Sequence, residues 1–232
     1  MPESMTEEIE EKTEHKGLKK GLYLLPSAFT AANIAMGFLA IIWSVRGFQI
    51  VAEKADFGVA FDGDADRSLF VDEKGNFVDG DATLWAMAQL LQSHGKLNND
   101  TVVATVMSNI GLELALRESN IGMVRTSVGD KYVMEEMQKR GIALGGEQSG
   151  HVIFADYLFT GDGLCTALNV LQTVASSGRT LADLADDLVN YPQVLLNVRL
   201  TPGQDWKANT LLASETKAVE AELGDTGRVL IR

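Results

Sequence analysis

The chain has 232 residues and a formal net charge of −12, and 46% of its residues are hydrophobic. This length is sufficient for one large domain or two small ones with a real hydrophobic core. The acidic balance argues against nucleic acid as a partner, because phosphate backbones require clustered Lys and Arg. A single cysteine, Cys165, excludes a framework of disulfides within the chain.

The first predicted elements are a charged tail at residues 1–20 and an uncharged stretch that follows it. No side chain between positions 21 and 45 carries a charge. A helix of that length crosses a hydrocarbon core of about 30 Å. The pattern therefore predicts a membrane-spanning helix at residues 21–46, with a buried core helix as the alternative. Lysines before the stretch outnumber Arg46 after it, which would place residues beyond 50 outside the cytoplasm.

Residues 16–47 carry the order K-G-L-Y-L-L-P-S and then F-T-x-A-N-x-x-x-G. This order resembles the first membrane segment of bacterial CDP-diacylglycerol–serine phosphatidyltransferases. The D-G-x-x-A-R reaction motif of that family is not found in this sequence, so the resemblance does not extend to phospholipid chemistry.

From residue 51 onward the sequence alternates between β-branched apolar runs and amphipathic stretches. Strands are expected at Phe57–Phe61, Ser68–Val71, Phe77–Val78, Thr101–Met107 and Met123–Ser127. Helices are expected from a cap at Asp81 to about Ser93, near Gly111–Ser119, at Lys131–Arg140 and at Leu164–Ala175. The alternation predicts an α/β fold with a mixed, mostly parallel sheet and flanking helices. The last stretch resembles the opening of another small α/β unit, with Val194–Leu200, a helix near Leu211–Leu223, and Arg228–Ile231.

An acidic loop, D-G-D-A-D-R at residues 62–67, directly follows the first expected strand. Its three carboxylates repel one another unless a divalent cation lies between them, and Mg2+ is the usual ion when a phosphate completes its shell. Arg67 would then face that phosphate. One alternative is a solvated turn. Another is a calcium loop with Glu73 as its twelfth residue, although Arg67 occupies the sixth place, where such loops need glycine.

A second polar loop, G-G-E-Q-S-G-H, occupies residues 145–151. Glu147 and Ser149 are two residues apart, so an extended backbone would direct both to the same side. The flanking glycines allow a ligand to approach the backbone closely. A carboxylate beside a hydroxyl suits the neighbouring hydroxyls of a sugar. The alternative is a polar glycine turn without a ligand.

Together with T-S-V-G-D-K-Y-V between them, these two loops resemble the α-D-phosphohexomutase superfamily. The glutamine in G-E-Q-S-G-H points to its phosphoglucosamine mutase branch. The resemblance runs from about residue 51 to residue 232 and implies the end of a second domain at 51–80, a third domain at 81–190 and the start of a fourth at 191–232. The implied reaction is the Mg2+-dependent, cytoplasmic interconversion of glucosamine 6-phosphate and glucosamine 1-phosphate. Membrane association would follow only from a genuine N-terminal helix.

The resemblance also implies a role for each matched residue. The Mg2+ ligands would be Asp62, Asp64 and Asp66, and Arg67 would lie beside the transferred phosphoryl group. Glu147 and Ser149 would bind sugar hydroxyls. Lys131 would face the active cleft as a basic group, and His151 would end the sugar loop.

Two further loops of the family are not found in this sequence. They are the T-x-S-H-N loop with the phosphate-carrying serine and the P-S-G-T-E-P loop that binds phosphate. Little or no mutase activity is therefore expected from this chain alone, and exposed apolar surface is expected to favour self-association. The alternatives are a membrane-tethered module that binds sugar phosphate or metal without catalysis, and the phosphomannomutase/phosphoglucomutase branch.

Overall fold

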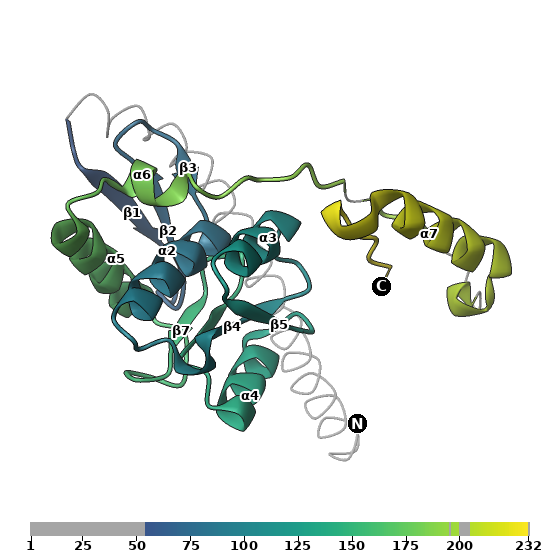
Figure 1. Cartoon of the computed structure of the whole chain (residues 1–232), viewed down its shortest axis with the longest axis horizontal. Coiled ribbons are helices and arrows are strands. Elements are labelled where there is room, and N and C mark those ends of the chain that lie inside the picture. The colour runs from purple at the N-terminus through teal and green to yellow at the C-terminus, as the bar shows by residue number, and fades with distance from the viewer. Residues whose placement is uncertain (1–53, 195, 200–204, 232) are drawn as a thin grey trace, which may run out of the picture.

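The computed structural model describes residues 54–194, 196–199 and 205–231 (Figure 1). The membrane helix predicted at 21–46 lies outside these residues, as does the stretch 16–47 that was compared with phosphatidyltransferases. Within the described ranges, no helix combines the length and the apolarity needed to cross a bilayer.

The first three strands form a small antiparallel sheet in the order β1-β2-β3. They are β1 (Phe57–Phe61), β2 (Ser68–Asp72) and β3 (Phe77–Val78), which confirms the three strands expected here. Phe61 lies opposite Ser68 and Phe57 lies opposite Asp72. The acidic loop therefore connects the two strands at one end of the hairpin, and Glu73 follows β2 at the other end.

Helix α2 spans Gly80–Ser93. It begins two residues earlier than expected, because a cap at Asp81 would make residue 82 the first helical residue. Asp79 is the N-cap, and its carboxylate accepts a hydrogen bond from the Ala82 N–H at 3.0 Å. The Asp-Gly-Asp sequence offers two candidate caps, and either would precede the same apolar run. The prediction of Asp81 as the cap was wrong, because Asp81 lies fully buried inside the first turn.

The second sheet has the strand order β5-β4-β6-β7. Its strands are β4 (Thr101–Thr105), β5 (Gly122–Thr126), β6 (Leu144–Gly146) and β7 (Val152–Phe154). β4 pairs in parallel with β5 and β6, whereas β7 is antiparallel to β6. The prediction of a mixed, mostly parallel sheet is confirmed. β6 and β7 were not predicted, and they flank the glycine-rich loop.

Helices cover both faces of this second sheet. They are α2, α3 (Ile110–Glu118), α4 (Asp130–Arg140), α5 (Gly163–Ser177) and the short α6 (Leu181–Ala185). Along β4, Val102 and Ala104 belong to the main core with α2, α3 and α5, whereas Val103 packs against Val133 and Met137 of α4. Successive strand residues point to opposite faces, so one buried strand contributes to both layers.

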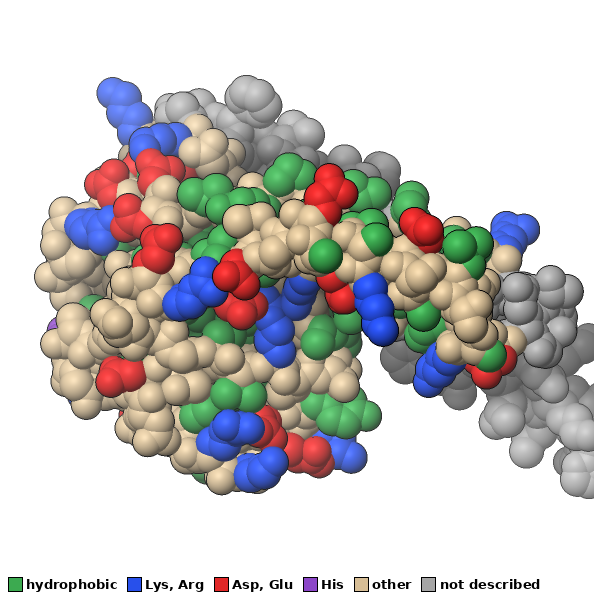
Figure 2. Space-filling view, turned by 45° about the vertical axis from the view of Figure 1, so that its right-hand side comes forward, with side chains coloured by type: hydrophobic (Ala, Val, Ile, Leu, Met, Phe, Trp, Pro, Cys, Tyr) green, Lys and Arg blue, Asp and Glu red, His purple; other side chains and the backbone are tan. Residues whose placement is uncertain are grey.

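The C-terminal residues form one helix, α7 (Thr210–Leu223), between irregular segments. An extended chain runs from α6 toward α7 (Figure 1), and its described residues between 194 and 199 form no strand. Residues 228–231 form none either, so the α/β pattern expected here is confirmed only for its helix. A strand needs a hydrogen-bonded neighbour, and Val194 and Val198 are instead 82% and 78% exposed. Acidic, basic and hydrophobic side chains are interspersed on this part of the surface (Figure 2).

Candidate metal and sugar site

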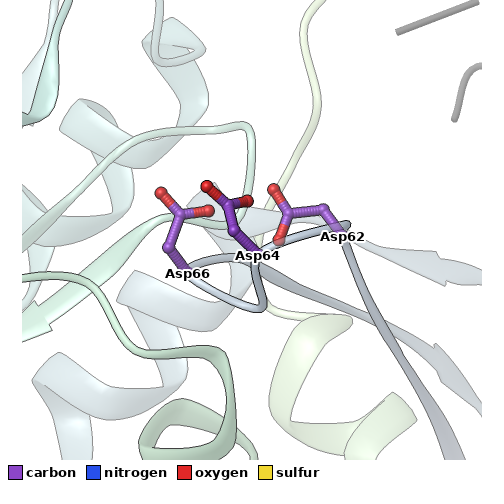
Figure 3. Close-up of side chains that lie close together, drawn as sticks. All are labelled: Asp62, Asp64 and Asp66. Atoms are coloured by element: carbon purple, nitrogen blue, oxygen red, sulfur yellow. The ribbon is translucent and has the colours of Figure 1, made fainter. Parts of the chain in front are cut away.

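The three carboxylates of the acidic loop converge on one small volume. Asp62, Asp64 and Asp66 each offer an oxygen atom, and these oxygens lie within 4.8 Å of one another (Figure 3). Ala65 has a left-handed backbone with φ of 59°, and its N–H donates to Asp62 O at 3.3 Å. This tight turn brings alternate side chains to one side of the loop, as an extended segment also would.

The donor set fits a hard divalent cation. Burial, hydrogen bonding to Asp62 and the charge of Asp62 together raise the pKa of Asp66 above its usual value. Asp66 Oδ1 is buried and has no hydrogen-bond partner within the described residues. Oxygens bound to one Mg2+ are separated by at most about 4.2 Å, so small side-chain rotations suffice to close the set around an ion.

Arg67 partly offsets the negative charge of the loop. Its Nε lies 3.8 Å from Asp62 Oδ2 and 3.9 Å from Asp66 Oδ1, and its side chain is 47% exposed. Both distances exceed normal hydrogen-bond length, so these contacts are loose. The guanidinium can therefore turn toward an incoming anion at little cost.

Glu73 does not belong to this cluster. It follows β2 at the far end of the hairpin, and its Oε2 accepts from the Ala182 N–H at 3.3 Å. Five residues of strand at about 3.4 Å each separate the two hairpin ends by roughly 17 Å. The calcium-loop alternative, in which Glu73 is the twelfth ligand, is therefore excluded by the fold.

Backbone hydrogen bonds hold the glycine-rich loop against the residue that directly follows the acidic loop and against the start of α2, although about eighty residues separate the two loops in sequence. Ser68 N donates to Gly150 O at 3.1 Å, and Gly80 N donates to Gln148 O at 3.0 Å. A Cβ on Gly80 would come within 2.0 Å of Glu147 O, so the approach requires glycine. The two polar loops identified in the sequence therefore form one continuous surface.

The glycine-rich loop is a turn between β6 and β7 rather than an extended segment. Gly150 N donates to Glu147 O at 3.0 Å and closes the turn. Glu147 is buried with 8% exposure, and its Oε1 accepts from the Gly129 N–H at 3.0 Å, whereas Ser149 is exposed. The extended backbone that was expected to direct both side chains to one side was therefore wrong. The turn places them in different environments.

His151 lies below this surface. It is 3% exposed, and its Nε2 is 3.6 Å from Asp66 Oδ2. The imidazole therefore lies beside a carboxylate of the acidic loop. Its Nδ1 is buried and has no hydrogen-bond partner within the described residues.

Lys131 stands apart from both loops on the first turn of α4. Its side chain is 69% exposed, and its Nζ lies 3.7 Å from Glu135 Oε1 one turn further along the helix. The backbone nevertheless connects it to the site, because Glu147 binds Gly129 two residues earlier. The backbone at Gly129 therefore connects Lys131 to the glycine-rich loop. No hydrogen bond or ion pair joins the described side chain of Lys131 to the acidic loop.

Asp79 was not identified from the sequence, and Gln148 was identified only as a mark of the family branch. Gln148 Nε2 donates to Asp79 Oδ2 at 3.2 Å, and Asp79 also caps α2. The contact ties the glycine-rich loop to the start of that helix. Their contact had only a weak signal in the sequence, because an N-cap role for Asp79 and a turn role for Gln148 explain the two residues separately.

Comparisons with known proteins agree with this geometry. Residues 79–191 match the family model for phosphoglucomutase/phosphomannomutase, alpha/beta/alpha domain III. A phosphoglucosamine mutase of Oceanobacillus iheyensis is 46% identical over 215 residues, which are 93% of this chain and 48% of that protein. A phosphoglucosamine mutase of a Polaromonas species is 54% identical over 183 residues, which are 79% of this chain and 41% of that protein.

A solved structure also matches. The putative phosphomannomutase of Thermus thermophilus has a TM-score of 0.57 and 30% identity, and the match covers 62% of this chain and 32% of that one. The chain spans about half the length of the curated relatives it matches. The Oceanobacillus match covers more of the chain than residues 51–232 alone, so it extends upstream of residue 51. The resemblance of residues 16–47 to phosphatidyltransferases stays a prediction.

Sequence identity, the family model and the α/β/α layering concern the same region. Residues 79–191 of this chain are thus similar, in sequence and in fold, to the α/β/α domain III of the phosphoglucomutase/phosphomannomutase family.

Proposed function

We propose that this chain carries the metal loop and the sugar loop of a phosphoglucosamine mutase, which interconverts glucosamine 6-phosphate and glucosamine 1-phosphate. The observation that carries the proposal is the hydrogen-bonded junction between the two loops, with Ser68 N donating to Gly150 O at 3.1 Å. The junction places three carboxylates next to a turn that offers polar groups to a sugar. The relatives named phosphoglucosamine mutase, at 46% and 54% identity, support this branch.

In this proposal the side chains have distinct tasks. Asp62, Asp64 and Asp66 would hold Mg2+, which when bound neutralises charge on phosphoryl oxygens. Arg67 would turn from its loose contacts with Asp62 and Asp66 and donate to the phosphoryl group of the substrate.

The sugar would be held on the other side of the junction. Ser149, exposed at the tip of the turn, would donate to or accept from a sugar hydroxyl. Glu147 would hold the turn in place through Gly129 while facing the sugar with its carboxylate. His151 would support the floor of the site beside Asp66, and Lys131 would approach the substrate phosphate by leaving Glu135.

This chain alone is expected to bind its ligands but to catalyse little turnover. The T-x-S-H-N and P-S-G-T-E-P loops named above are not among its residues, so the proposal includes ligand binding with little turnover by the chain alone. Isothermal titration with Mg2+ and with glucosamine 6-phosphate tests the binding. Asp64→Asn is expected to abolish Mg2+ binding, and Ser149→Ala is expected to weaken sugar-phosphate binding alone. Failure of the wild-type chain to bind either ligand would contradict the proposal.

Two other functions make different predictions in the same experiment. A binding module without catalysis would bind sugar phosphate and give no turnover even when the missing mutase domains are supplied as a separate protein. A phosphomannomutase or phosphoglucomutase would bind mannose or glucose phosphates more tightly than glucosamine phosphate. The identity of 30% with the Thermus phosphomannomutase makes that comparison worthwhile.

A further inference from the structure

The loop that follows β4, Val106–Asn109, contacts the C-terminal part of the chain at two separate points. We name this loop the anchor loop, and we name residues 206–231 the C-terminal unit. The chain leaves the α/β domain near Tyr191, passes along the extended segment to α7 and continues to Arg228 (Figure 1). Both contacts therefore join residues that are far apart in sequence.

The first contact fixes the outgoing chain, by which we mean the residues near Tyr191 where the chain leaves the α/β domain. The Asn109 side chain donates from Nδ2 to Tyr191 O at 2.8 Å, and its Oδ1 accepts from Tyr191 N at 3.1 Å. One side-chain amide thus pairs with both backbone groups of one residue, which fixes the orientation of that residue as well as its position. A Cβ on Gly111 would lie 1.8 Å from Val189 O, so the outgoing chain rests directly on the first turn of α3.

The second contact fixes the returning chain, by which we mean the residues around Arg228 that follow α7. Arg228 Nη2 donates to Val106 O and, at 2.8 Å, to Ser108 O. Arg125 donates from Nη1 to the same Ser108 oxygen at 3.3 Å and binds Glu113 Oε2 at 2.8 Å. Burial and the neighbouring Arg125 lower the pKa of the Arg228 guanidinium. Because its acceptors are backbone carbonyls, the Arg228 contact depends on the shape of the anchor loop.

A buried carboxylate holds that shape from the opposite side. Asp81 Oδ2, in the first turn of α2, accepts from Asn109 N at 2.7 Å, and Asp81 is fully buried. A hydrogen bond from a backbone N–H to an ionised carboxylate is about twice as strong as a neutral one. The anchor loop is therefore connected to the core by a contact that is independent of both C-terminal contacts.

We propose that the anchor loop sets the position of the C-terminal unit on the α/β domain, with Asn109 holding the outgoing chain and Arg228 holding the returning chain. Two attachment points remove the rotational freedom that one flexible connection leaves. A connection as long as residues 192–205 would by itself allow an end-to-end spread on the order of 20 Å. The inference concerns residues outside the metal and sugar loops and goes beyond the proposed function.

Pulsed electron paramagnetic resonance on the full chain tests this role. In a Cys165→Ser background, spin labels are attached at Gln138→Cys on α4 and Glu215→Cys on α7, both of which are exposed. The parent protein is expected to give one narrow distance distribution. Arg228→Gln is expected to broaden it toward a spread on the order of 20 Å, the value for a single flexible connection.

Arg117→Gln is the matched control. Arg117 lines the same cavity between α3 and the C-terminal unit as Arg228, and among the described residues we find no hydrogen bond from it to the anchor loop. This variant is expected to keep the narrow distribution. Equal broadening in Arg117→Gln would overturn the proposal, because a general charge effect would then explain it.

A urea unfolding curve separates positioning from general stability. Arg228→Gln is expected to leave the unfolding midpoint of the α/β domain unchanged while the distance distribution broadens. An unchanged distribution in folded Arg228→Gln would overturn the proposal, as would a loss of the α/β fold without any selective release of α7. Asn109→Ala is expected to broaden the distribution as well. Because that variant removes a helix cap, Arg228→Gln decides the outcome.

Discussion

Asp81→Asn is expected to abolish a pH dependence of stability that originates at one buried carboxylate. Asp81 is fully buried, and desolvation raises its pKa to about 6 from an ordinary value of 3.8, although the Asn109 N–H opposes the rise. The folded state therefore holds this proton more tightly than the unfolded state. Stability from this group is present below about pH 4 and is lost as the pH rises through about 6.

The expected change in the free energy of unfolding follows from the rise in the pKa of Asp81. One pKa unit corresponds to 1.36 kcal/mol, so a rise of roughly two units amounts to about 3 kcal/mol in full, of which about 2 kcal/mol falls between pH 4 and pH 7. Asparagine keeps an oxygen that can accept from Asn109 N and carries no charge at any pH. The free energy of unfolding of the wild type, minus that of Asp81→Asn, is therefore expected to fall by about 2 kcal/mol between pH 4 and pH 7.

Urea unfolding of both proteins at pH 4, 5, 6 and 7 measures this difference. Asp66 also has a raised pKa, but it is present in both proteins, so its contribution cancels. Asp156→Asn, at an exposed position, is the control for removing one acidic group. A wild-type minus variant difference that is constant from pH 4 to pH 7 would show that burial does not raise the pKa of Asp81.

Four further outcomes are expected. Mg2+ affinity, measured by isothermal titration, should fall on acidification at a higher pH than for ordinary carboxylates, because a proton competes for Asp66, whose pKa is raised. Glu73→Gln should leave the Mg2+ dissociation constant unchanged, because Glu73 binds Ala182 N at the far end of the hairpin. Gly80→Ala should lower the free energy of unfolding by about 1–3 kcal/mol in urea titrations, because its Cβ would collide with Glu147 O. Leu168→Glu should reduce self-association in sedimentation velocity, because Leu168 is 56% exposed within an apolar stripe on α5, whereas unchanged association would exclude that stripe.

The long elements could be predicted from the sequence because their burial repeats with a regular period. The helix expected at Leu164–Ala175 lies within α5, which Asp162 caps, and β1 has the predicted bounds. β6 and β7 were missed because each has only three residues, and β6 contains two glycines, which strands disfavour. β6 pairs with β4, which is distant in sequence, and β7 pairs with β6, so the stability of both short strands depends on a contact that local sequence does not show.

The candidate site could also be predicted only in part from the sequence. The sequence identified both polar loops, since each has a distinctive residue order. It could not show that Glu147 binds Gly129, that His151 is buried beside Asp66, or that Lys131 points toward Glu135. Those contacts depend on the shape of a five-residue turn and on the packing beneath it, and the turn reverses the expectation drawn from an extended backbone.

The acidic loop shows why residue spacing alone does not determine which ion a site prefers. The same D-x-D-x-D spacing begins a calcium loop when the chain returns to the ion at its twelfth residue. Here β2 leads away from the loop in register with β1, so Glu73 ends roughly 17 Å from the three aspartates. Three carboxylates on one side leave the other side open for water and phosphate oxygens, which suits Mg2+ better than Ca2+, an ion that takes six to eight ligands. The antiparallel pairing of β1 with β2, and not the spacing of the aspartates, is therefore the feature that argues against a calcium loop.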